Sequence, residues 1–90
     1  MEQHEENLSR VIERIIAAID NHAVGDIVTV ASLMADAGLA PENYDTGELF
    51  EITERFHEEA RRRKIKFGDA PYDGIIGGLP FEYRFVIKKK

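Results

Sequence analysis

The chain has 90 residues and a formal net charge of -5, from 17 acidic and 12 basic side chains. A chain of this length is expected to form one domain, residues 1–90, with a modest core. It contains no cysteine, which excludes a disulfide framework and a thiolate zinc site and favours a reducing cytoplasm. No apolar run approaches the roughly 18 to 20 residues of a membrane-spanning helix, and the acidic start is unlike a secretory signal, so no membrane association is expected.

The charge is divided unevenly along the chain. Residues 1–60 carry three basic and fourteen acidic side chains, a net charge of -11, whereas residues 61–90 carry nine basic and three acidic ones, a net charge of +6. An asymmetry of this size bears on the partners of a protein and not on its fold.

The first regular apolar pattern predicts a helix over residues 6–22. Its apolar residues recur at steps of three and four, and they are Leu8, Val11, Ile12, Ile15, Ile16 and Ile19. Asn21 and Gly25 follow as residues that can adopt the left-handed conformation that ends a helix. Residues 1–6 have no apolar anchor, so we expect them to be frayed.

A β-branched run at residues 26–30 is too short for a helix and predicts an edge strand. A second helix is predicted over residues 30–38. Thr29 or Ser32 is placed to cap its start, and Gly38 is placed to end it.

Residues 29–41, TVASLMADAGLAP, resemble the first helix and turn of a helix-turn-helix motif, in which a small residue packs inside and a glycine makes the turn. In such a motif the recognition helix begins at once. Here a second set of turn and cap signals follows. We therefore expect residues 40–46 to form a loop with one helical turn, in which Tyr44 is the packing anchor.

The longest element is a helix predicted over residues 46–63, which Asp45 and Glu48 start as a capping box. One face is apolar and must be covered, and it consists of Leu49, Ile52, Thr53, Phe56 and Ala60. Glutamates occupy the body of the helix. Four cations occupy its end, where they complement the free carbonyl groups of the last turn.

After this helix the period changes from three-and-four to two, without a break in the chain. The alternation predicts an antiparallel hairpin that pairs residues 64–68 with residues 81–88. The order of elements is similar to that of a winged helix. We therefore predict an α+β, winged-helix-like fold of three helices with a C-terminal antiparallel β-hairpin.

The connection between the two predicted strands is too long for a tight turn. It contains a turn signal at residues 71–74 and a pair of glycines at residues 77–78 that predicts a bulge. It also carries four large apolar residues, Ile75, Ile76, Leu79 and Phe81. These residues either fold back onto the core or form an exposed patch that binds a partner.

The predicted hairpin and the preceding helix end carry a cluster of cations. The candidate binding residues are Arg61, Arg62, Lys64, Lys66, Arg84 and Lys88. On adjacent strands these side chains would share one outward face, which suits contact with nucleic acid phosphates. The same cluster also has a simpler interpretation, as a helix end that complements its dipole and a solvated tail.

Base recognition is not supported, because the segment in the position of a recognition helix is acidic, with Arg55 as its one cation. Residues 74–77 share only the letters of the GxxG motif of KH domains. They also lack the lysine and the hydroxyl residue that a phosphate-binding loop requires after its glycines.

No catalytic or metal constellation is predicted. Glu54 and His57 have the spacing of half a di-iron site but lack the other half, so we favour a surface histidine beside Glu58. Ser9 and Ser32 show no triad arrangement. We therefore expect a non-enzyme without cofactor or metal.

Two functions remain. The first is a small regulator that contacts nucleic acid through its basic hairpin, and the second is a protein-interaction module with no nucleic-acid binding. A third possibility, an acidic surface that imitates nucleic acid, has only the charge in its favour.

Overall fold

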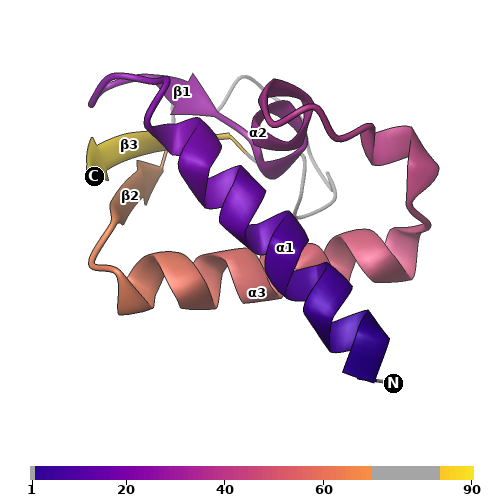
Figure 1. Ribbon diagram of the computed structural model, residues 1–90. Helices are drawn as coiled ribbons and strands as arrows, with labels where there is room; N and C mark the ends of the chain where they lie inside the picture. The colour runs from indigo at the N-terminus through magenta and orange to yellow at the C-terminus, as the bar shows by residue number, and fades with distance from the viewer. Residues whose placement is uncertain (1, 70–83) are drawn as a thin grey trace.

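The computed structural model describes residues 2–69 and 84–90. The described elements follow one another as α1 (Glu2–Ile19), β1 (Ile27–Val28), α2 (Val30–Asp36), the 3-10 turn η1 (Pro41–Asn43), α3 (Thr46–Arg62), β2 (Lys66–Asp69) and β3 (Phe85–Lys89). Figure 1 shows α1 crossing α3, with α2 beside α1 and the strands together at one end of the molecule. The three predicted helices are therefore confirmed.

The apolar stripe of α1 explains why this helix lies at the centre of the packing. It buries Leu8, Ile12, Ile15, Ile16 and Ile19 against both α2 and α3. Burying an aliphatic side chain stabilises the fold by roughly 1.5 to 3 kcal/mol. α1 begins at Glu2, before the start at residue 6 that the apolar pattern predicted.

The turn after α1 and the loop that contains η1 agree with most of the predictions made for them. α1 ends at Ile19 and is followed by turns, in which Gly25 has a φ of +101°. Asn21 does not adopt a positive φ, so only the glycine makes the predicted left-handed turn. Tyr44 is half-buried against the core, as expected of an anchor.

Both α2 and α3 begin with a reciprocal capping box. At α3 the carboxylate of Asp45 accepts from the Glu48 amide at 2.8 Å, while the Glu48 carboxylate accepts from the Asp45 amide at 3.1 Å. At α2 the same exchange joins Thr29 and Ser32 at 2.9 Å in each direction. Each box supplies acceptors for amides that have no partner within the helix.

We expect Asp45→Ala to lower the free energy of unfolding by about 1 kcal/mol, because the Glu48 amide in the first turn of α3 loses its acceptor. Asp45→Asn keeps a side-chain oxygen at the cap and should cost much less. Urea denaturation of both variants checks this, and equal losses would contradict the capping role.

α2 and α3 also end in the same way, in a Schellman motif. After α2 the amide of Leu39 donates to the Met34 carbonyl at 2.8 Å, around Gly38 with a φ of +79°. After α3 the amide of Ile65 donates to the Ala60 carbonyl at 2.9 Å. The predicted unbroken passage from helix to strand is therefore wrong: a turn intervenes, and the strand begins at Lys66.

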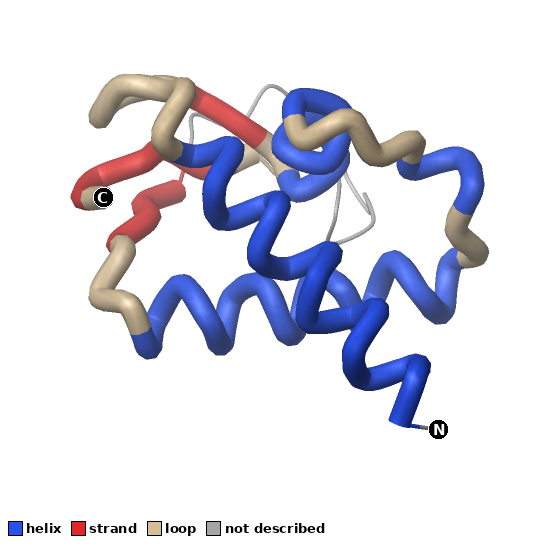
Figure 2. Tube along the Cα trace, in the orientation of Figure 1, coloured by secondary structure: helices blue, strands red, loops and turns tan. Residues whose placement is uncertain are grey.

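The three strands form one antiparallel sheet in the order β1-β3-β2, so β3 is central. β2 pairs with β3, which confirms the predicted hairpin in the described residues, and β1 pairs with the other side of β3 as the predicted edge strand. Figure 2 shows the red strands gathered beyond the ends of α1 and α3. The fold is α+β and winged-helix-like, although its strands are not all C-terminal.

The inner face of the sheet completes the core. Phe85 and Ile87 of β3 are buried and Phe67 of β2 packs against the core, with the rings of Phe67 and Phe85 against Phe56 of α3. The predicted turn at residues 71–74, the predicted bulge at residues 77–78 and strand residues 81–83 lie outside the described residues. Among the described helices, none has the length and apolar character needed to cross a membrane.

Candidate functional site

Five exposed cations lie around the end of α3 and the adjoining ends of β2 and β3. We call them the hairpin basic surface, and they are Arg61, Lys64, Lys66, Lys88 and Lys89. Within the described part of the chain none of the five takes part in an ion pair. The surface therefore presents positive charge that the described carboxylates leave available.

Strand pairing places two of these lysines side by side. Lys66 at the start of β2 is the pairing partner of Lys89 at the end of β3, next to a register shift between Lys66 and Phe67. Like charges on directly opposite positions of neighbouring strands are destabilising. The pair concentrates charge at a cost in stability.

Lys88 lies flat across the outer face of the hairpin. A Cβ atom built on Gly68 would come within 2.5 Å of Lys88 Cε, so the aliphatic stem of the lysine occupies the space that a side chain at this position would fill. Gly68 thereby lets a cation from β3 extend over β2.

Lys64 occupies the left-handed position of the turn that ends α3, with a φ of +62°. It is the only residue other than glycine with a positive φ in the described ranges 2–69 and 84–90. The equivalent position after α2 is Gly38, the residue that this conformation favours. A lysine in this position again costs stability.

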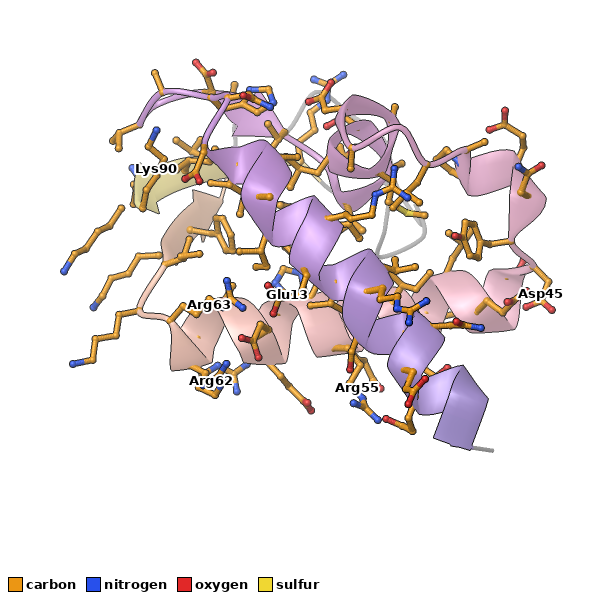
Figure 3. The ribbon with its side chains drawn as sticks, in the orientation of Figure 1. Glu13, Asp45, Arg55, Arg62, Arg63 and Lys90 are labelled. Carbon is orange, nitrogen blue, oxygen red and sulfur yellow. The ribbon has the colours of Figure 1, made fainter. Side chains whose placement is uncertain are left out.

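Arg62 and Arg63 do not contribute free charge to the surface. Both guanidinium groups bind the Glu59 carboxylate, Arg62 through Nε at 3.0 Å and Arg63 through Nε at 2.6 Å, and Arg63 also pairs with Glu13 of α1. The hydrogen bonds from Arg62, and then from Arg63, lower the pKa of Glu59 to about 2. Figure 3 shows Arg62 and Arg63 at the last turns of α3, with Glu13 of α1 beside them.

The predicted proximity of Arg84 to the end of α3 is wrong. Arg84 is exposed and immediately precedes β3, whose first residue, Phe85, pairs with Asp69 at the far end of β2. Because the strands are antiparallel and rise about 3.3 Å per residue, Phe85 lies roughly 10 Å along the hairpin from Lys66, and Arg84 lies one residue farther. The predicted apolar patch, Ile75, Ile76, Leu79 and Phe81, lies outside the described residues.

His57 is not the surface histidine that the sequence suggested. Its ring is half-buried and packs edge-on against Phe67 at 6.1 Å and against Phe85 at 5.8 Å between ring centroids. Burial, and then the charge of Arg61, lower the pKa of His57. This histidine therefore belongs to the margin of the core.

A second histidine, His22, links three segments of the chain whose proximity no sequence pattern predicted. His22 Nε2 lies 2.6 Å from a carboxylate oxygen of Asp36 at the end of α2, and Nδ1 lies 3.1 Å from a carboxylate oxygen of Asp26 before β1. Lys90 Nζ donates to the His22 carbonyl at 2.6 Å. Figure 3 shows Lys90 at the sheet end of the molecule. We call this arrangement the His22 clasp.

The described residues contain no group of three or more histidine, aspartate or glutamate side chains that could hold a metal ion. Comparisons of this chain with protein families, with curated proteins and with solved structures found no match. A functional assignment for the hairpin basic surface therefore depends on its own geometry and charge.

Proposed function

We propose that this protein is a non-catalytic, winged-helix-like binding module that contacts nucleic acid phosphates through its hairpin basic surface. The observation that carries the proposal is the placement of Lys64 and of the Lys66–Lys89 pair at positions where a lysine costs stability, through the left-handed backbone at Lys64 and through like-charge repulsion in the pair. Residues that break local structural rules mark functional positions. A phosphate backbone that neutralises the Lys66–Lys89 pair would offset the repulsion between its like charges, and a phosphate contact would account for a lysine in place of glycine at position 64.

The electrostatics of the rest of the domain define how nucleic acid would approach. The exposed side of α3 carries Glu54 and Glu58. Arg55 Nη2 donates to both carboxylate oxygens of Glu5, at 2.9 and 3.0 Å. Acidic side chains are repelled by the phosphates that line a groove. The domain would therefore approach with the hairpin first, and α3 would not enter the major groove.

Phosphate contacts of this kind give affinity without reading sequence. The proposed activity is therefore sequence-tolerant binding that falls steeply as salt concentration rises. The absence of cysteine in the sequence supports a cytoplasmic setting.

The test uses binding to a random-sequence duplex as a function of salt, beginning at about 50 mM. Lys66→Gln and Lys89→Gln should each weaken binding and reduce the slope of log affinity against log salt by about 0.9. Arg55→Gln removes the same charge outside the surface and should leave the slope unchanged. No affinity of the wild type for duplex or single strand at this salt concentration would overturn the proposal in favour of a protein-interaction module.

Lys64→Gly separates binding from stability. Glycine suits the left-handed turn, so this variant should be more stable than the wild type by about 1 kcal/mol and yet bind the duplex less tightly. Urea denaturation and the same salt titration measure the two effects. Weaker binding together with lower stability would point to a damaged fold and not to a lost phosphate contact.

A further inference from the structure

A second surface lies at the start of α3, away from the hairpin basic surface. An open groove of about 370 Å³ runs between α1 and the first turns of α3, and residues of the loop before α3 also line it. Figure 3 shows the separation, because Asp45 marks the start of α3 and Arg62 its other end.

The groove has apolar residues at its base. Leu8 of α1 and Ile52 of α3 are buried, and Val11, Leu39 and Tyr44 are each half-buried beside them. Half-buried apolar side chains keep part of their surface in contact with water, so an apolar group placed in the groove would release that water.

Two arginines of α1 line one side of the groove. Arg10 and Arg14 are separated by four residues and so lie on the same face of the helix. They are two of only three cations in the acidic first 60 residues, and the third, Arg55, is paired with Glu5. Neither Arg10 nor Arg14 has a carboxylate partner among the described residues.

Arg14 is held in place by the end of α2. Its Nη2 donates to the Ala37 carbonyl at 2.6 Å and lies 3.2 Å from where a Cβ atom would stand on Gly38. One of the five guanidinium N–H donors is used in this contact, which leaves others for a ligand. The arginine is therefore already positioned before anything binds.

The opposite side of the groove is acidic. It carries Glu48 and Glu51, and the Glu48 carboxylate also accepts from the Asp45 amide in the capping box. An anionic ligand would therefore be attracted to the α1 side and repelled from the α3 side. This arrangement fixes the orientation of whatever binds.

We propose that this groove binds a short acidic segment of a partner protein that places one large apolar side chain against Val11, Leu39 and Tyr44. An open groove suits a peptide better than a small molecule, whose sites usually enclose 70 to 90% of the ligand surface. Carboxylates of the segment would accept from Arg10 and Arg14 in charge-assisted hydrogen bonds. This surface is separate from the hairpin basic surface and does not depend on its function.

The absence of tryptophan from the protein allows a direct test. The probe is a twelve-residue peptide with glutamates on both sides of one tryptophan, whose fluorescence reports its own burial. We expect saturable binding with a blue shift of the tryptophan emission, weakened about tenfold by Arg10→Gln and weakened by added salt. Arg55→Gln, the matched charge change outside the groove, should bind the peptide like the wild type.

Two control peptides separate the contributions, one with the glutamates replaced by lysine and one with the tryptophan replaced by serine. Both should bind at least tenfold more weakly than the probe. The proposal is overturned if the acidic tryptophan peptide shows no saturable binding, if Arg10→Gln leaves its affinity unchanged, or if the lysine peptide binds equally well. Concentration-dependent dimerisation abolished by Arg10→Gln would assign the groove to a second copy of the chain and overturn it as well.

Discussion

Phe56→Ala is expected to lower the free energy of unfolding by about 3 to 5 kcal/mol. Phe56 has no exposed surface, and its ring lies 5.7 Å from Phe67 and 6.2 Å from Phe85 between centroids. Truncation would leave a cavity where α3 meets the inner face of the sheet. Because small domains have a total stability of roughly 5 to 10 kcal/mol, the variant should be largely unfolded at 37 °C, as urea denaturation followed by circular dichroism would show.

The matched control is Phe50→Ala, the same chemical change on the same helix. Phe50 is 39% exposed, so its truncation removes less buried surface and should cost much less than Phe56→Ala. A loss below about 1 kcal/mol for Phe56→Ala would mean that the apolar face of α3 does not pack as described.

The sequence predicted the helices and the hairpin well, because their signals are local. The apolar period of α1, the capping box of Asp45 and Glu48, and the alternation around Phe67 each arise within a few residues, and each is present in the structure. Burial follows the same periods: Phe56, Phe85 and Ile87 all point inward as expected.

The composition of the candidate site was harder to predict, because it depends on contacts between distant residues. Glu13 and Arg63 are 50 residues apart, and no periodic pattern signals that they pair across α1 and α3. The free charge therefore differs from the sequence-based prediction, in which Arg62 was an available cation.

The other differences between the predicted and the observed site arise from the register in which β2 and β3 pair. The alternation in the sequence does not show which residues of β2 and β3 face each other, and this pairing places Lys89 beside Lys66 and Arg84 at the far end. Lys64 has a positive φ because it occupies the left-handed position of the Schellman turn after α3. After α2 a glycine, Gly38, occupies the same position and signals the turn in the sequence. After α3 a lysine replaces the usual glycine, so the sequence does not signal the turn.

The His22 clasp should make stability depend on pH. A neutral imidazole has one N–H donor and only the imidazolium has two, so contacts with both Asp26 and Asp36 favour the charged ring. The hydrogen bond with Asp36 raises the pKa of His22 above its ordinary value of 6.5, although burial acts in the opposite direction. The Ala23 amide, and then His22, lower the pKa of Asp26 below 3.8.

The pKa shifts of His22 and Asp26 define the pH range in which the clasp stabilises the fold. A raised histidine pKa gives stability that is complete below 6.5 and lost as pH rises through the folded-state pKa. A lowered aspartate pKa gives stability that is present above 3.8 and lost as pH falls through the folded-state pKa. The clasp should therefore contribute most between these two values.

His57 must be separated from this effect, because its lowered pKa has the opposite sign: its contribution is present above 6.5 and lost as pH falls through the folded-state pKa. The informative quantity is the difference in melting temperature between the wild type and His22→Gln, since both retain His57. We expect this difference to favour the wild type at about pH 5.5 and to shrink towards zero by about pH 8.5. A difference that stays constant over this range would mean that His22 does not change its charge within the clasp.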